Sequence, residues 1–179
     1  RRFLKLRHYE VQMIGVAPGR IVTLSATGGD DVMAATELGI VAGTLNTNSR
    51  QLVGDTSSRL SVAAGATLTL AGTSAFPLSF TPYVLAPTST LRYEQTNTAT
   101  VATSVTVGAA LTYGNLAVAP AVNSPTTHSF AAGTATVAGN LTIGNGANTG
   151  LVSVGDTTTL GVAGAVSISL ASTLVATGP

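Results

Sequence analysis

The sequence predicts an all-β protein, a parallel β-helix (β-solenoid) with about seven rungs. Each rung takes roughly 23–25 residues, a period typical of stacked repeat architectures. Three observations predict this fold. A short apolar-x-apolar motif recurs at a nearly constant step, the residues that flank the motif recur with it, and Gly, Asn, Pro, Ser and Thr separate short alternating stretches. The 179 residues are enough for one domain with a sizeable core.

The repeat is anchored on the first residue of each motif, and the steps in sequence number between successive anchors are 23, 23, 23, 25, 25 and 25. If the units stack in parallel, the anchors form one interior ladder, which consists of Val22, Leu45, Leu68, Leu91, Leu116, Leu141 and Val166. A second interior ladder follows two residues later, with Tyr93, Val118, Ile143 and Ile168. The one polar interruption of this second series is Thr47.

Glycines recur at the bends between the predicted strands. Gly114, Gly139 and Gly164 follow the longer step of the repeat, and each lies two residues before an anchor. Glycine at a bend indicates either a positive φ or a backbone approach that leaves no room for a Cβ atom. Asn115 and Asn140 share the same step, and they form either an amide ladder along the axis or ordinary turns.

A weaker half-repeat lies between the anchors. Val105 and Phe130 are again separated by the longer step. Each unit is therefore interpreted as two-stranded, and a two-stranded unit buries its apolar face only by stacking on its neighbours. The Val, Thr, Gly and Ser content disfavours helices.

Composition divides the chain into a basic N-terminal arm, residues 1–20, and a repeat domain, residues 21–179. The arm holds four of the eight basic residues in its first seven positions and does not match the repeat. A signal-peptide n-region is the alternative interpretation of the arm. The repeat reaches the last residues without a polar cap, so we expect a fragment of a longer rod that continues in further repeats or stacks end to end on copies of itself.

Charge and cysteine content exclude several classes of protein. The chain has no Cys and only 8% charged residues, with a net charge of +1. Disulfide scaffolds and Cys-ligated metals are excluded, and nucleic acid is not an expected partner. The apolar stretch from Leu160 to Val175 is interrupted by Ser and Thr, and its segment from Ala165 to Leu170 alternates with period two, so we do not expect a membrane-inserted helix.

The sequence offers little for catalysis, and we expect no enzyme activity, no cofactor and no metal. His8 lies in the arm and His128 in a predicted turn, without a metal-like spacing to other ligands. Asp30-Asp31 is the only adjacent acidic pair, and a solvated loop is favoured over a catalytic dyad or a calcium site. Asp55 and Asp156 each follow a glycine and are typical of Asx turns.

Threonines spaced two residues apart raise the alternative of an ice-binding face. Ice binding requires the same Thr-x-Thr at the same phase in every rung, whereas these pairs fall at different phases relative to the anchors. The stretches concerned are Thr67-Thr69, Thr96-Thr98-Thr100, Thr134-Thr136 and Thr157-Thr159.

The repeats resemble those of large secreted β-strand-repeat proteins, the adhesin-like or autotransporter-like surface proteins of Gram-negative bacteria. The resemblance covers roughly residues 43–178 and rests on Gly65-Ala66-Thr67-Leu68-Thr69-Leu70, Phe76-Pro77-Leu78-Ser79-Phe80, Thr90-Leu91-Arg92-Tyr93-Glu94, Tyr113-Gly114-Asn115-Leu116 and Gly139-Asn140-Leu141-Thr142-Ile143. It implies a parallel β-helix displayed outside the cell, without catalytic residues to carry over.

We therefore expect a non-enzymatic, extracellular structural or adhesive module of a bacterial surface protein or filament. Surface glycans or a neighbouring cell surface are the expected external partners. The alternatives are a carbohydrate-binding or carbohydrate-cleaving β-helix, which would use Asp30 and Asp31, and an ice-binding solenoid.

Overall fold

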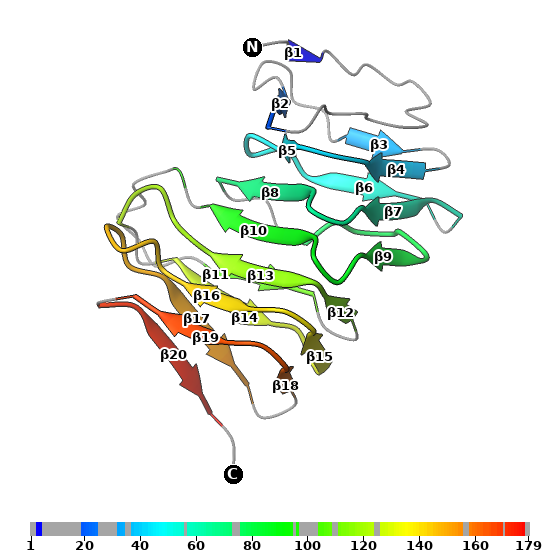
Figure 1. Ribbon diagram of the computed structural model, residues 1–179. Coiled ribbons are helices and arrows are strands. Elements are labelled where there is room, and N and C mark those ends of the chain that lie inside the picture. The colour runs from blue at the N-terminus through cyan, green and yellow to red at the C-terminus, as the bar shows by residue number, and fades with distance from the viewer. Residues whose placement is uncertain are drawn as a thin grey trace.

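The structure is a computed structural model in which parallel strands stack as a β-solenoid (Figure 1). It describes residues 3–4, 19–24, 32–34, 37–55, 57–72, 76–94, 96, 104–108, 111–123, 126–155, 158–169 and 171–177. Every strand pairing in this part of the chain is parallel, as predicted. Within the same ranges, no helix is long and apolar enough to cross a membrane.

The longest face of the coil is an eight-stranded parallel sheet, sheet A, which runs from the first turn to the last. Its strands, in spatial order, are β1 (Phe3–Leu4), β2 (Ile21–Leu24), β5 (Thr44–Asn46), β8 (Thr67–Ala71), β10 (Thr90–Glu94), β13 (Asn115–Val118), β16 (Leu141–Ile143) and β19 (Val166–Ile168). The spatial order follows the chain order, so each turn is laid on the one before it.

Two further faces close the coil, and each is divided between earlier and later turns. In the earlier turns, sheet C contains β3 (Val32–Ala34) and β6 (Leu52–Gly54), and sheet B contains β4 (Glu37–Ile40), β7 (Arg59–Val62) and β9 (Tyr83–Leu85). In the later turns, sheet D contains β11 (Ser104–Val107), β14 (Thr127–Phe130), β17 (Leu151–Val154) and β20 (Thr173–Ala176), and sheet E contains β12 (Leu111–Tyr113), β15 (Gly133–Val137) and β18 (Thr158–Val162).

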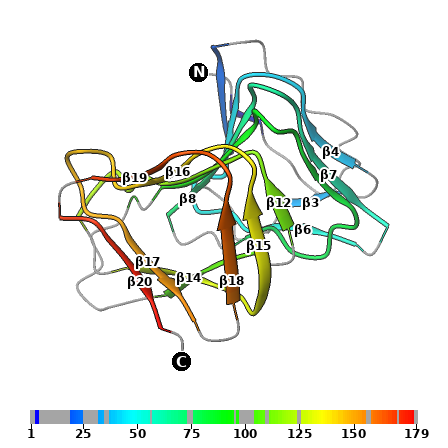
Figure 2. The ribbon, with the colours of Figure 1, turned by 60° about the horizontal axis from the view of Figure 1, so that its bottom comes forward.

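A turn therefore has up to three strands, one per face, where the sequence predicted two. Figure 2 shows this in the later turns, where strands of sheets A, D and E surround a common interior. The coil makes about five turns, slightly fewer than the seven predicted rungs.

Sheet A carries both steps of the repeat in its register. Leu45 is paired with Leu68 and Leu68 with Leu91, at the shorter step. Leu91 is paired with Leu116 and Leu116 with Leu141, at the longer step. The step lengthens between β10 and β13, as the sequence predicted, and the interior ladder continues across the change.

Burial along this ladder is complete only in the middle of the coil. The side chains of Leu45, Leu68 and Leu116 are inaccessible or nearly so. Val166, by contrast, is 49% exposed, which corrects its assignment to a closed interior. The cause is the position of β19 at the edge of sheet A, where no described strand covers its far side. At the opposite end, Val22 is only partly buried.

The spacing of the half-repeat differs from the register of the second face. Val105 is paired with His128, and Phe130 is paired with Val107. The same sheet continues with a different step, since His128 pairs with Val152. The corners between sheets A and D differ in length from turn to turn, so the spacing of sheet A is not transmitted to sheet D.

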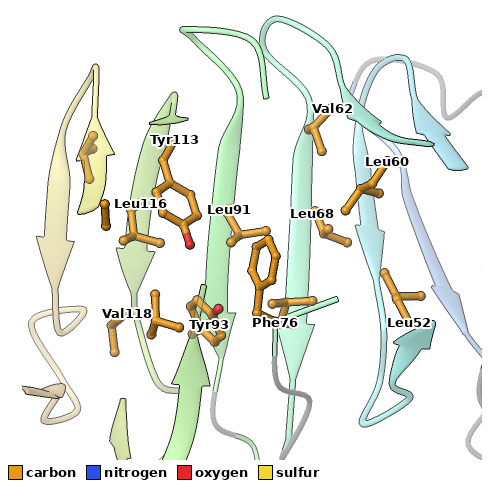
Figure 3. Packing of buried hydrophobic residues seen from close by; sticks show 14 of the residues in the cluster. Leu52, Leu60, Val62, Leu68, Phe76, Leu91, Tyr93, Tyr113, Leu116 and Val118 are labelled. Atoms are coloured by element: carbon orange, nitrogen blue, oxygen red, sulfur yellow. The ribbon is translucent and has the colours of Figure 1, made fainter. Parts of the chain in front are cut away.

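An aromatic cluster fills the interior where the earlier side sheets give way to the later ones. The Phe76 ring centroid lies 5.0 Å from that of Tyr83 and 6.3 Å from that of Tyr113. Figure 3 shows Phe76, Tyr93 and Tyr113 among the leucines of the ladder. These large rings fill the core at the point where only sheet A remains continuous, and they join the two parts of the coil.

The N-terminal arm is not entirely separate from the coil. Phe3 and Leu4 form β1, which pairs with Thr23 and Leu24 of β2. These two apolar residues, within a basic run, extend sheet A by one strand. Residues 1–2 and 5–18 of the predicted arm lie outside the described part of the chain.

Candidate functional site

The outer side of sheet A is the most regular surface of the molecule. Because the ladder residues point inward, the residues on either side of each anchor point outward. One outer column contains Ile21, Thr44, Thr67, Thr90 and Asn115, and the other contains Thr23, Asn46, Thr69, Arg92, Ala117, Thr142 and Ser167. Most of these side chains are small and polar, with hydroxyl and amide groups predominating, although Ile21 of β2 is exposed and Thr69 of β8 is buried.

The two repeated asparagines hold successive turns together. Asn115 Oδ1 accepts a hydrogen bond of 2.9 Å from the backbone N–H of Asn140, and Asn140 Oδ1 accepts one of the same length from Ala165. The Asn115 amide also donates to the carbonyl of Ser89 at 3.2 Å. The structure therefore shows an axial ladder, as one of the two interpretations predicted, but it runs from side-chain amide to backbone rather than from amide to amide.

The three bend glycines lie beside these asparagines, and close backbone approach explains them. None of the three has a positive φ. A Cβ atom on Gly139 would meet Asn115 Oδ1 and the carbonyl oxygen of Gly114, and one on Gly164 would meet the carbonyl oxygen of Gly139. At Gly114 the obstacles are the carbonyl oxygens of the preceding turn. In the earlier turns the corresponding glycine works differently, since Gly43 has a φ of +69°.

Two of the described carboxylates form ion pairs on the outside of the coil. Glu37 Oε1 lies 3.7 Å from Arg59 Nε and accepts a hydrogen bond of 2.8 Å from the Ser61 hydroxyl. Glu94 Oε2 lies 2.9 Å from Arg92 Nε, although the N–H bond is not aligned on the oxygen. Both carboxylates thus have local partners and belong to different faces, so they do not converge on a common site.

Asp55 forms the Asx turn that the sequence predicts. Its Oδ1 accepts hydrogen bonds from the backbone N–H of Ser57 at 2.8 Å and from the hydroxyls of Ser57 and Ser58 at 2.7 and 2.9 Å. The Ser57 side chain, the Ser57 backbone and the Ser58 side chain together lower the pKa of Asp55. A carboxylate held in this way stabilises a turn and stays ionised.

The other predicted acidic candidates cannot be placed. Asp30, Asp31 and Asp156 lie outside the described residues, as does His8. Among the residues that the structure describes, no three His, Cys, Asp or Glu side chains gather as metal ligands would. The paired carboxylates on which the carbohydrate-cleaving alternative depends therefore have no described geometry.

His128 lies inside the coil, which corrects its assignment to a turn. It belongs to β14, where Thr127 and Ser129 are partly accessible while His128 and Phe130 are buried. The period-two alternation of Thr-His-Ser-Phe was the signal that could have placed it. The imidazole packs edge-on against Tyr93 with ring centroids 5.4 Å apart. Burial lowers the pKa of His128 to about 4, and a hydrogen bond with the backbone of Leu151 opposes only part of this shift.

The threonine pairs lie on different faces, as their phases indicated. Thr67 and Thr69 belong to β8 of sheet A, whereas Thr134 and Thr136 belong to β15 of sheet E. In sheet A, β8 is the only described strand with threonine on both sides of its anchor. The described part of the coil thus lacks the repeated Thr-x-Thr array that an ice-binding face requires.

Comparison with known proteins leaves the fold as the basis for any assignment. No family model, curated protein or solved structure matches this chain. The architecture is therefore assigned from its own strand pairing and burial. The expected kinship with secreted β-strand-repeat surface proteins remains a resemblance in the repeats.

Proposed function

We propose that this chain is a non-enzymatic structural or adhesive module of an extracellular bacterial surface protein or filament. The observation that carries the proposal is the in-register outer face of sheet A, which extends over all the turns. A surface of this kind offers length and repetition rather than a concave site. The described carboxylates support the same interpretation, because each is engaged locally with arginine or serine partners.

The low charge of the later turns fits an external rod. From Thr96 to Pro179 the sequence contains one charged residue, Asp156. Small hydroxyl and amide side chains keep such a surface hydrated without creating a strong electric field. Contact with another neutral surface, such as a glycan or a second rod, then carries little electrostatic penalty. Surface glycans, or the surface of a host or neighbouring cell, are the external partners that we propose on this basis.

The proposed assembly partner is another β-solenoid turn, either of further repeats of the same protein or of a second copy placed end to end. The last strands of sheets A, D and E are β19, β20 and β18, and none has a described neighbour on its far side. They expose Val166, Ile168 and Val175. Unpaired parallel edges with aliphatic side chains are suited to accept another rung.

Light scattering coupled to size-exclusion chromatography tests the assembly partner. We expect the average mass of the purified chain to rise with concentration over the micromolar range. Ile168→Lys should suppress this rise, because it places a charge among the exposed aliphatic side chains, whereas Thr142→Lys on the outer face of sheet A should not. A monomer at all concentrations, or equal behaviour of both variants, would count against stacking.

A second assay tests the non-enzymatic part of the proposal. Incubation of the chain with a panel of polysaccharides should release no reducing ends. Release that disappears in an Asp30→Asn, Asp31→Asn double variant would overturn the proposal in favour of a carbohydrate-cleaving β-helix. Binding to the same panel without cleavage would agree with an adhesive surface.

A further inference from the structure

The later turns contain a buried histidine that the proposed structural role does not use. His128 is 3% exposed and lies in β14, an inner strand of sheet D. Its neighbours in register are Val105 on β11 and Val152 on β17. Its Nδ1 atom has no hydrogen-bond partner in the described part of the chain. This site tolerates a neutral imidazole, because an unprotonated Nδ1 in the apolar interior leaves only one acceptor unsatisfied.

Protonation changes the balance at this site. An imidazolium ion has two N–H donors and a full charge, and both are costly in an apolar interior unless they are paired. Among the described residues, Tyr93 is the titratable group that packs against the ring, from β10 of sheet A. Its hydroxyl donates to the carbonyl of Thr106 at 3.3 Å, and burial raises its pKa further, so it stays neutral and supplies no counter-charge. Val105 and Val152, on the strands that flank β14, offer none either.

The earlier turns have no comparable group in their described core. Their buried interior is mainly aliphatic, with Leu38, Ile40, Leu52 and Leu60, and the other buried side chains, such as Phe80 and Thr47, are neutral. The described acidic residues of those turns are Glu37 and Glu94, which form ion pairs at the surface, and Asp55, which lies in an exposed turn. Acid therefore places an unfavourable charge in one part of the coil and not in the other.

The sheet topology allows the two parts to respond separately. Sheets D and E contain only later strands, and sheets B and C only earlier ones, so sheet A is the one sheet that both parts share. In a solenoid each turn contacts only its neighbours, and turns can open from one end while the rest stays folded. The open edges of β18, β19 and β20 are the natural starting point for such opening.

From these observations we propose that His128 makes the later turns of the coil, β11 to β20, an acid-sensitive unit that opens when the imidazole is protonated while the earlier turns stay folded. This opening exposes the aliphatic side chains inside sheets D and E, together with strands that have lost their pairing partners. Acidification would thus add the interior of sheets D and E to the surface that this end of the coil offers for adhesion or assembly.

Hydrogen exchange detected by mass spectrometry at several pH values tests this proposal. After correction for the intrinsic pH dependence of exchange, peptides that cover β14, β17 and β20 should exchange at least tenfold faster at pH 4 than at pH 7. Peptides that cover β5 and β7 should change little. Equal acceleration in both parts, or none in the later turns, would overturn the proposal.

Two kinds of variant identify the residue responsible. His128→Leu should keep the later turns protected at pH 4, and His8→Gln, the matched change of the other histidine, should behave like the parent chain. Loss of protection in His128→Leu as large as in the parent would contradict the role of His128.

If His128→Leu does not fold, the His8→Gln chain provides the decisive measurement, because it contains His128 as its only histidine. The imidazole C–H resonances of this chain should titrate below the ordinary range of histidine, in step with the loss of protection in the later turns. Titration of the imidazole near pH 6.5, with the later turns still protected from hydrogen exchange, would overturn the proposal.

Discussion

Thr47 illustrates how one side chain accounts for an apparent flaw in the repeat. It interrupts the apolar series of the second interior ladder, yet it is fully buried. Its hydroxyl oxygen accepts a hydrogen bond of 3.0 Å from the backbone N–H of Ala71, the last residue of the neighbouring strand β8. A polar residue is tolerated in the core at this point because it satisfies a buried donor.

Replacing Thr47 with valine keeps the shape of the side chain and removes this acceptor. We expect Thr47→Val to lower the free energy of unfolding by about 1–3 kcal/mol, since the Ala71 N–H is left without its partner in the interior. Urea denaturation measures the change. Thr142→Val, on the outer face of sheet A, is the control and should stay within about 0.5 kcal/mol of the parent. A Thr47→Val chain as stable as the parent would show that the hydrogen bond is not needed.

His128 gives stability a pH dependence with a definite sign. Its pKa in the folded chain is about 4, below the 6.5 of the unfolded chain. The neutral form is therefore favoured by folding, and this contribution is complete above pH 6.5 and is lost as the pH falls towards 4. The loss amounts to about 3 kcal/mol. The midpoint of urea denaturation, measured at several pH values from 7.5 to 4, should fall with pH in the parent chain. In His128→Gln the midpoint should depend less on pH.

At the scale of the element, corner geometry decided what the sequence could predict. The anchors of sheet A were predictable because the chain between successive anchors keeps one length in each half of the coil. The side faces were not, because the corner from sheet A to sheet D shortens steadily. That corner comprises residues 95–103, 119–126, 144–150 and 169–172 in successive turns. A constant period on one face therefore hides shifts of register on the next, and for this reason the spacing of Val105 and Phe130 does not correspond to a register pair.

The spacing of the bend glycines was likewise visible in the sequence, but their physical role was not. A column of glycines is compatible with positive φ or with close approach, and only the positions of the neighbouring carbonyl and amide oxygens distinguish the two. Gly43 and Gly139 both lie two residues before their anchors, but glycine is needed for different reasons. Gly43 has a positive φ, whereas Gly139 is approached closely by neighbouring oxygen atoms. The carboxylates of Asp30 and Asp31 are the opposite case, since their adjacency in sequence has no described geometry to test it.

Gly139→Ala tests the close approach at the bends. A Cβ atom there would lie 2.9 Å from the Gly114 carbonyl oxygen and would also meet Asn115 Oδ1. We expect a loss of roughly 1–3 kcal/mol in unfolding free energy, because the stacked turns must separate to admit the methyl group. The control is Gly161→Ala, where no atom lies within 4 Å of the added methyl. The melting temperatures of the two variants are compared by thermal unfolding followed by circular dichroism. Similar melting of the two variants would refute the steric explanation.

At the scale of the whole molecule, the coil consists of two parts that share one sheet. Sheet A is continuous, whereas the other faces change between the earlier and the later turns. The aromatic cluster around Phe76 and Tyr83 fills this junction, close to the turn in which the repeat lengthens. The scarcity of charge and the many glycines of the sequence follow from the same architecture, in which inward positions are aliphatic and outward positions are small and polar.

The change of step makes the account directly testable with pairs of cysteines, because the chain itself has none. In the earlier turns, Thr44 pairs with Thr67 across sheet A. Register partners on neighbouring strands lie about 4.8 Å apart, within the range that a disulfide spans. Thr44→Cys with Thr67→Cys should therefore oxidise readily. Thr44→Cys with Thr69→Cys places the two residues about 8 Å apart and should oxidise poorly.

In the later turns the preference must reverse, and this comparison tests the central claim most directly. Ala117 pairs with Thr142 at the longer step, so Ala117→Cys with Thr142→Cys should form a disulfide under mild oxidation. Ala117→Cys with Asn140→Cys, at the shorter step, should not. Cross-linking yields from non-reducing electrophoresis that favour the shorter step in the earlier turns and the longer step in the later ones are the predicted result. The same preference in both parts, or no cross-link in either, would contradict the stacked β-solenoid described above.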